Sequence, residues 1–140
     1  MIDQTRTLVI GDLDPELQRA YDVAEQVLRA TEARLQPGVI AEHLYLLALD
    51  QMHEAGLSAH FMGYGADQVK FLGHGIGLEI DELPVLAKGF KYPLAPGMVI
   101  AIEPKFTFPG RGVVGIEDTY LITDTGYEKL TISREGILRI

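Results

Sequence analysis

Two apolar segments on either side of a tight turn constrain the fold of this chain more than any other feature. Residues 98–108 and 113–123 are rich in β-branched and aromatic side chains, and the four residues between them read Pro-Gly-Arg-Gly. Such a pattern predicts two antiparallel strands joined as a hairpin. If the hairpin is centred on Gly110, Glu103 faces Glu117 across it, because pairing register fixes which side chains meet.

Each of these glutamates lies within an apolar stretch, Glu103 after Val-Ile-Ala-Ile and Glu117 after Val-Val-Gly-Ile. Carboxylates directly opposite each other have Cβ atoms about 5 Å apart, and like charges at that spacing destabilise a hairpin. Either one carboxyl is protonated, or a cation lies between the two, or both side chains are solvated at the edge of a sheet. The two residues alone leave these alternatives open.

His74 lies in a glycine-rich passage, Gly73-His74-Gly75-Ile76-Gly77, which we expect to be a loop. Glycines on both sides allow the backbone to approach a crowded site closely. Imidazole together with carboxylates is a ligand set for Mn, Zn, Co or Fe. A single histidine in such a loop is nevertheless more often structural, and Asp3, near the start of the chain, is typical of a solvated residue when taken alone.

The rest of the chain predicts two helices and further strands. Residues 2–10 read as a strand, and a helix then begins with Asp14 as N-cap and Pro15 in its first turn and runs to the Gln-Pro-Gly stop at 36–38. A second helix is expected over residues 40–55 with Gly56 as its C-cap. A short strand is expected at 129–132. The helical positions expected in the core are Leu17, Ala20, Tyr21, Ala24, Val27, Leu28, Leu35, Leu44, Leu47, Ala48 and Met52. This order predicts an α+β domain with helices on one side of a largely antiparallel sheet.

Composition excludes several classes of protein. The chain has no cysteine, so it forms neither disulfides nor thiolate metal sites, and its 47% hydrophobic content is enough for a globular core. A net charge of −8 with scattered lysines and arginines disfavours binding to a nucleic-acid backbone. No apolar run reaches the roughly 18–20 residues needed to span a bilayer, and we expect no membrane interaction.

Four short motifs, taken together and in this order, resemble a known family. They are residues 3–7 (DQTRT), 73–77 (GHGIG), 102–104 (IEP) and 116–118 (IED), and residues 123–131 add a similar closing stretch. The pattern resembles the pita-bread metallopeptidases of the creatinase/aminopeptidase group, and its first motif favours the Xaa-Pro dipeptidase and aminopeptidase P branch. The resemblance covers essentially the whole chain and implies a curved, mainly antiparallel sheet with helices on its outer side.

The resemblance also implies a function and a site. It implies two divalent metal ions (Mn, Co, Zn or Fe), with Asp3, His74, Glu103 and Glu117 as ligands present here. In such a site a water bridging the metals attacks the scissile carbonyl of a proline-containing peptide and releases the N-terminal residue, and His74 and Glu103 are the expected catalytic residues, with Glu103 moving the proton. It further implies a cytoplasmic homodimer and a small apolar pocket for the imide bond.

Three departures from the family pattern reduce the expected activity. The family's other aspartate ligand precedes the first motif by about a dozen residues, so we expect residues 1–140 to be the C-terminal portion of one catalytic domain, with reduced or empty metal occupancy. Asp81 stands where a second histidine usually binds substrate, and a carboxylate only accepts hydrogen bonds. Gly115 replaces an arginine. We therefore expect a poor catalyst, with a peptide- or protein-binding module as the alternative function and metal-free creatinase-like hydrolysis ranked last.

Other polar and aromatic residues receive structural interpretations. Asp118 should point away from Glu117 as a surface residue or a hydrogen-bond acceptor. His43, His53 and His60 are expected to be surface or packing residues. Tyr64, Tyr92 and Phe106 are expected to be aromatic core residues, with the lining of a substrate pocket as the alternative.

Overall fold

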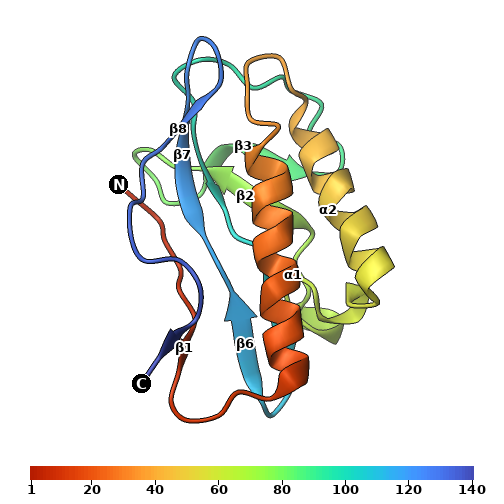
Figure 1. Cartoon of the computed structure of the whole chain (residues 1–140). Coiled ribbons are helices and arrows are strands. Elements are labelled where there is room, and N and C mark those ends of the chain that lie inside the picture. The colour runs from red at the N-terminus through yellow and green to blue at the C-terminus, as the bar shows by residue number, and fades with distance from the viewer.

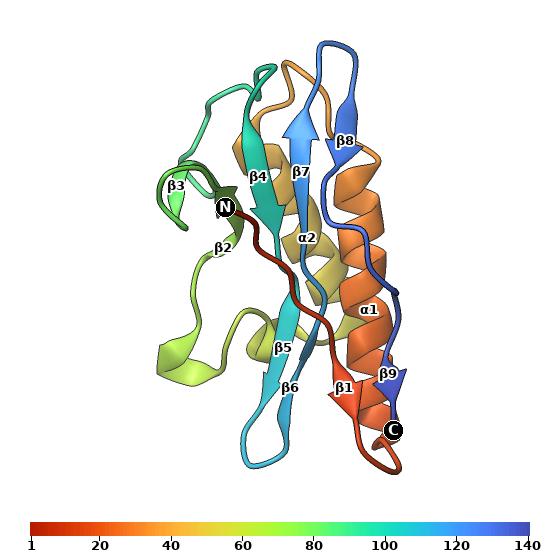
Figure 2. The ribbon, with the colours of Figure 1, turned by 90° about the vertical axis from the view of Figure 1, so that its left-hand side faces the viewer.

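A computed structural model describes all 140 residues as two helices packed on one face of a sheet (Figure 1). The helices are α1 (Pro15–Glu32) and α2 (Ala41–Ala55), followed by single 3-10 turns at Ser58–His60 and Gly65–Asp67. The strands are β1 (Leu8–Val9), β2 (Phe71–Gly75), β3 (Glu82–Ala87), β4 (Val99–Ile102), β5 (Lys105–Phe108), β6 (Gly112–Gly115), β7 (Asp118–Ile122), β8 (Tyr127–Lys129) and β9 (Leu138–Arg139). Turned by 90°, the molecule shows its first residues crossing the sheet face opposite the helices (Figure 2).

Both helices begin and end close to the predicted positions. The Asp14 side chain accepts a hydrogen bond of 2.8 Å from the Glu16 amide, which caps α1 as expected. Helix α1 ends at Glu32, somewhat before the predicted stop, and Gly56 caps α2. Of the expected core positions all are buried except Leu47, which is half-buried, while Tyr45 is an additional core residue.

The hairpin is confirmed, but as two pairs of strands instead of one. β4 pairs with β7 and β5 with β6, and both pairs are antiparallel in the single register predicted from Gly110, with Ile102 opposite Asp118 and Lys105 opposite Gly115. Between these pairs the regular ladder is interrupted. The Glu103 amide donates to the Leu72 carbonyl and the Glu117 amide to the Thr5 carbonyl. The interruption frees the chain at both glutamates and lets other segments reach them.

The five-stranded sheet has the order β3-β2-β4-β7-β8 and is antiparallel throughout. The prediction that residues 73–77 form a loop was wrong for residues 73–75, because His74 lies on β2 between β3 and β4. Strand β3 was not predicted. The expected strands at 2–10 and 129–132 were also placed wrongly. Within residues 2–10 only Leu8 and Val9 form a strand, which pairs with β9, while Thr5 makes an isolated bridge to Glu117, and β8 ends at Lys129.

Glycine at position 73 is required by this packing. A Cβ atom there would lie 2.2 Å from the carbonyl oxygen of Ala101 on β4, and one at Gly75 would lie 2.3 Å from that of Leu83. Real Cβ contacts are never that short, so β2 fits between its neighbours only without side chains at these two positions. Gly73 and Gly75 therefore allow β2, and with it His74, to lie between the two neighbouring strands.

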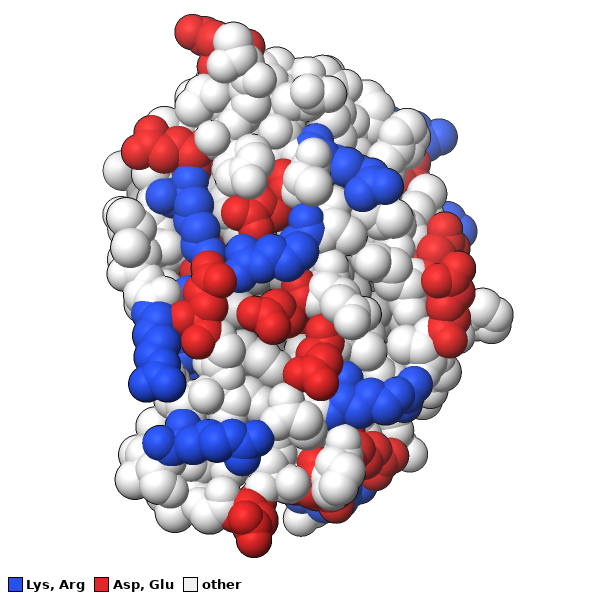
Figure 3. Space-filling model, in the orientation of Figure 1, with Lys and Arg blue, Asp and Glu red and all other residues white.

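The core lies between the two helices and the sheet and contains large side chains from both layers. Phe106, Tyr120, Ile100 and Ile102 from the strands pack in one cluster with the helical core residues. No helix is both long and apolar enough to cross a bilayer. On the face seen in Figure 3 acidic and basic side chains are interspersed, without a broad basic patch.

Candidate metal centre

The four residues suggested as metal ligands come together although they are far apart in sequence. The atoms that Asp3, His74 and Glu117 can offer to a metal all lie within 4.8 Å of one another. His74 Nε2 is 3.9 Å from Asp3 Oδ2 and 3.4 Å from Glu103 Oε1. His74, Glu103 and Glu117 are each 7% exposed or less. Buried carboxylates converging on an imidazole form an O,N donor set suited to a divalent cation, so the residues present fit the metal that the sequence motifs imply.

His74 is oriented by its own strand. Its Nδ1 donates a hydrogen bond of 3.0 Å to the Gly75 carbonyl, because a carbonyl oxygen can only accept. This bond fixes the ring so that Nε2 faces the carboxylates, the arrangement typical of metal-binding histidines. The hydrogen bond to Glu103 is the main reason why the pKa of His74 is raised to about 9.

Glu117 is the carboxylate with the most unfavourable surroundings. Burial, helped by the nearby charges of Glu103 and Asp3, raises its pKa to about 7, and a 2.6 Å hydrogen bond from the Thr5 hydroxyl only partly opposes this rise. A buried carboxyl that is hard to ionise signals a place where positive charge is missing. A bound divalent cation would remove this penalty.

Glu103 has the opposite electrostatic balance. Burial raises its pKa, but hydrogen bonds from His74 and Lys105 outweigh burial and hold the pKa below its ordinary value. Lys105 Nζ contacts Glu103 Oε2, and its side chain is 38% exposed. Sequence analysis missed Lys105, although a lysine next but one to a buried glutamate on a strand is a recognisable signal, since such residues point to the same face.

Asp81 lies beside the cluster. Its Oδ1 is 3.2 Å from His74 Nε2, while 72% of its side chain remains exposed. Two shallow cavities adjoin it, of about 270 Å³ and 190 Å³, and both are lined by His74, Asp81 and Val85. Asp81 therefore faces open space and competes with Glu103 for the same imidazole nitrogen.

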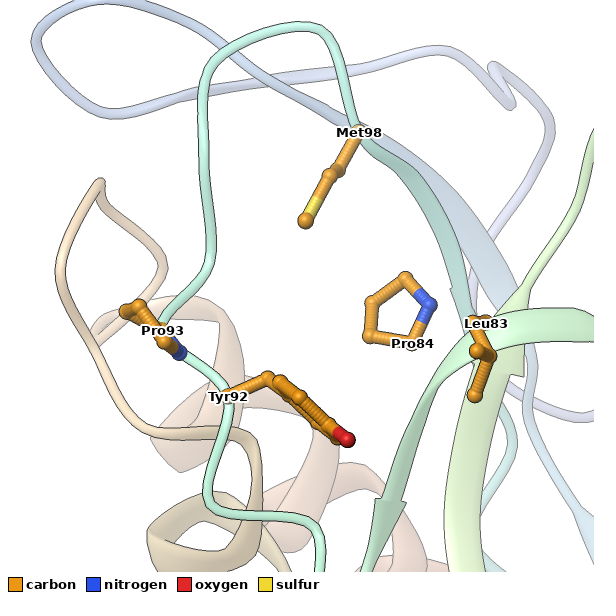
Figure 4. A pocket seen from close by; sticks show the side chains of 5 residues that line it. All are labelled: Leu83, Pro84, Tyr92, Pro93 and Met98. Atoms are coloured by element: carbon orange, nitrogen blue, oxygen red, sulfur yellow. The ribbon is translucent and has the colours of Figure 1, made fainter.

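An apolar cavity of about 260 Å³ lies next to these, and Leu83 lines both it and the 270 Å³ cavity. Figure 4 shows its other walls: Pro84, Tyr92, Pro93 and Met98. Tyr92 is 61% exposed and Tyr64 45%, so the prediction that they are core aromatics was wrong, whereas Phe106 is fully buried. Tyr64 and Tyr92 were wrongly assigned because both lie in exposed loops, a position that aromatic character alone does not reveal.

The segment that carries Asp3 is held by a buried ion-pair network. Arg6 Nη2 and Lys129 Nζ each lie 2.7 Å from Asp118, which is fully buried, and the Thr131 hydroxyl donates to it at 2.7 Å. The surface alternative for Asp118 was wrong and the hydrogen-bond acceptor alternative is confirmed.

The three other histidines lie outside the cluster, as predicted. His60 stacks on Phe108 with ring centroids 4.3 Å apart, while His43 and His53 are exposed.

Gly115 contacts the segment of residues 3–7 only through its backbone, as expected for a glycine. Its amide donates to Thr7 Oγ1 at 3.0 Å, and its carbonyl accepts from the same hydroxyl at 2.8 Å. The Asp3 amide likewise donates to Thr119 Oγ1 at 3.2 Å. Residues 3–7 are thus bound along β6 and β7 on the face that carries both glutamates.

An imidazole and carboxylates gathered on one sheet are compatible with a metallopeptidase, and comparison with known proteins gives this class. The model of metallopeptidase family M24 matches residues 1–124. The chain belongs to metallopeptidase family M24.

Curated relatives share substantial sequence identity with the chain. A probable dipeptidase PepE from Mycobacterium tuberculosis is 39% identical over 124 residues, covering 89% of this chain and 31% of its own length. An Xaa-Pro dipeptidase from Pyrococcus furiosus is 39% identical over 137 residues, covering 97% and 37%. The chain therefore spans about a third of the length of these relatives.

Solved structures confirm the predicted α+β pita-bread fold, of which the chain corresponds to a C-terminal part. Dipeptidase PepE from Mycobacterium ulcerans superposes with a TM-score of 0.86 at 34% identity, covering 97% of this chain and 35% of that protein. Prolidase from Pyrococcus furiosus gives 0.86 at 34%, covering 96% and 38%. A methionine aminopeptidase from Rickettsia prowazekii, at 19% identity and a TM-score of 0.73, shares the fold.

Metal binding to this cluster should strengthen as pH rises. His74 must lose a proton to act as a ligand, and Glu117 must also be ionised, with pKa values of about 9 and about 7. We expect the apparent Kd for Mn²⁺ to fall about tenfold per pH unit between pH 7 and 9, and more steeply below pH 7, because ligation releases protons. Titration calorimetry across this range measures the slope. An affinity independent of pH would contradict the assignment of His74 and Glu117 as ligands.

Proposed function

We propose that these residues form part of a catalytic domain that releases the N-terminal residue from Xaa-Pro peptides with the help of two divalent metal ions. The observation that supports this most is the convergence of Asp3, His74 and Glu117 within 4.8 Å, with Glu103 in contact with His74. Membership of family M24 implies divalent ions and peptide substrates. Mn, Co, Zn and Fe all suit this donor set, and we further propose that the protein is a cytoplasmic homodimer.

The residues divide into two roles in this reaction. Asp3, His74, Glu103 and Glu117 would hold the cations, which lower the pKa of water and stabilise negative charge developing on the scissile carbonyl. Glu103 is the proposed proton carrier from the attacking water to the leaving nitrogen. Hydrogen bonds from His74 and Lys105 hold its pKa below the ordinary value, and a bound cation that displaced Lys105 would also favour the ionised carboxylate that accepts the proton.

The cavities beside His74 are the proposed substrate site. Asp81 would lie next to the scissile bond, and the apolar cavity lined by Leu83 and Pro84 would take an apolar side chain or proline ring. Apolar walls with few polar groups favour a proline-sized ring over a charged side chain.

The test is peptide hydrolysis with and without Mn²⁺, using Ala-Pro and Gly-Pro, together with direct titration of Mn²⁺. The proposal predicts metal binding that is lost in His74→Ala, and release of free amino acid that depends on the metal. Retention of full metal binding by His74→Ala would overturn the proposed centre. A protein that binds Mn²⁺ and peptide without cleaving it would instead support a peptide-binding module, which the exposed Asp81 beside His74 also favours.

Changing Asp81 to histidine should increase hydrolysis of Xaa-Pro peptides. A carboxylate cannot donate a hydrogen bond to a substrate carbonyl, whereas an imidazole can, and one good donor at such a site changes rates by about a hundredfold. We expect kcat/KM for Ala-Pro to rise by at least tenfold in Asp81→His. The exposed Asp124→His serves as the control. An unchanged or lower rate in Asp81→His would show that Asp81 is not in the position of a substrate-binding donor.

A further inference from the structure

Lys105 occupies an oxygen of Glu103 that a cation would otherwise bind. Its Nζ contacts Glu103 Oε2, while His74 Nε2 lies 3.4 Å from Oε1. Both oxygens of a carboxylate that is only 7% exposed therefore already face positively charged or hydrogen-bonding groups. Lys105 itself forms no other ion pair.

Gly115 makes this position of the lysine possible. Lys105 and Gly115 are a cross-strand pair on β5 and β6. A Cβ atom at position 115 would lie 2.6 Å from Lys105 Cβ and 2.8 Å from the Pro104 carbonyl oxygen. Any side chain at 115, including an arginine, would force the stem of Lys105 and its backbone to move. The two residues therefore act together: the glycine provides the space, and the lysine provides a positive charge at Glu103.

We infer that Lys105 is an internal counter-ion, which neutralises Glu103 in the metal-free protein and must leave it when a divalent cation binds. The inference rests on the proposed metal centre. A carboxylate oxygen that accepts a hydrogen bond from an ammonium group cannot use the same lone pairs to ligate a metal. Two cations within a few ångströms also repel each other strongly at a buried site.

This arrangement has two opposite consequences. Without metal, Lys105 offsets the repulsion among Asp3, Glu103 and Glu117, so it stabilises the folded state. With metal, the same ammonium group competes for Glu103, so it weakens binding. A lysine with a purely structural role would have only the first effect, and a lysine that merely contacts substrate would have neither.

The experiment compares Lys105→Met with Lys91→Met, which removes the same charge from an exposed lysine outside every ion pair. Thermal melting is measured without metal and with saturating Mn²⁺, and Mn²⁺ affinity is measured by calorimetry at one pH and ionic strength. For Lys105→Met we expect a lower metal-free Tm, about tenfold tighter Mn²⁺ binding and a larger rise in Tm on adding Mn²⁺. Lys91→Met should match the unaltered protein, and Lys105→Arg, which keeps the charge, should stay close to it in metal-free Tm.

Unchanged or weaker Mn²⁺ binding in Lys105→Met would overturn the inference. If the unaltered protein binds no Mn²⁺, the proposed metal centre itself fails. The counter-ion role is then decided by metal-free melting alone: a lower Tm for Lys105→Met than for Lys91→Met supports it, and equal values overturn it. The two failures are thus distinguishable.

Discussion

Replacement of Glu103 by glutamine is expected to lower kcat/KM for metal-dependent hydrolysis of Ala-Pro by about three orders of magnitude. Glutamine has nearly the same shape but cannot accept and return a proton, and it is a weaker metal ligand. It also leaves the Lys105 ammonium and the His74 imidazole without the charge that they both contact. The rate should be compared at saturating Mn²⁺, so that a loss of proton transfer is separated from a loss of metal.

Glu128→Gln is the matched control, because Glu128 is an exposed glutamate on β8 that forms no ion pair. It should retain the unaltered rate and the unaltered Tm. A Glu103→Gln protein that binds Mn²⁺ and still hydrolyses Ala-Pro within about tenfold of the unaltered rate would remove Glu103 from the chemistry.

Local sequence patterns were sufficient for the helices and the hairpin. Asp14, Pro15 and Gly56 are capping signals within a few residues of the helix ends they mark, and the turn around Gly110 fixes the register of β4–β7 and β5–β6. These elements are determined by residues close together in the chain. Strand β2 could not be recognised in this way, because Gly73 and Gly75 have low strand propensity and are selected by contacts with β4 and β3.

In the candidate site, too, features marked by nearby residues were predicted and those that depend on distant contacts were not. Glu103 and Glu117 stood out because carboxylates in apolar strands contradict the local pattern, and such contradictions concentrate at functional sites. Their assignment as metal ligands, together with Asp3 and His74, came from the resemblance to a known family. Thr5 and Lys105, whose hydrogen bonds lower the pKa values of Glu117 and Glu103, were missed. Thr5 and Lys105 reach these glutamates only because the ladder opens between Ile102 and Lys105, and no periodicity in the sequence marks that opening.

The anchoring of residues 3–7 gives the largest expected effect on stability. Asp118 is completely buried and accepts from Arg6, Lys129 and Thr131, each at 2.7 Å. Asp118→Ala would leave Arg6 facing a buried space without a counter-charge, and Lys129 would keep only Glu135 as a partner. Breaking a buried ion pair in this way typically costs about 3–5 kcal/mol of unfolding free energy. Urea denaturation measures this loss, with the exposed Asp124→Ala as a control that should lose almost nothing.

The dependence of this loss on pH and on metal separates it from a simple packing defect. Burial raises the pKa of Asp118, but the hydrogen bonds from Lys129 and Arg6 outweigh burial and hold it below its ordinary value of 3.8. Its contribution to stability is therefore complete above pH 3.8 and is lost as pH falls through the lower, folded-state pKa, so the difference between Asp118→Ala and the unaltered protein should shrink in acid. Because Arg6 is tied to Asp118 and lies three residues after Asp3, the substitution should also weaken Mn²⁺ binding. A protein that loses stability but keeps its Mn²⁺ affinity would show that the position of Asp3 does not depend on this ion pair.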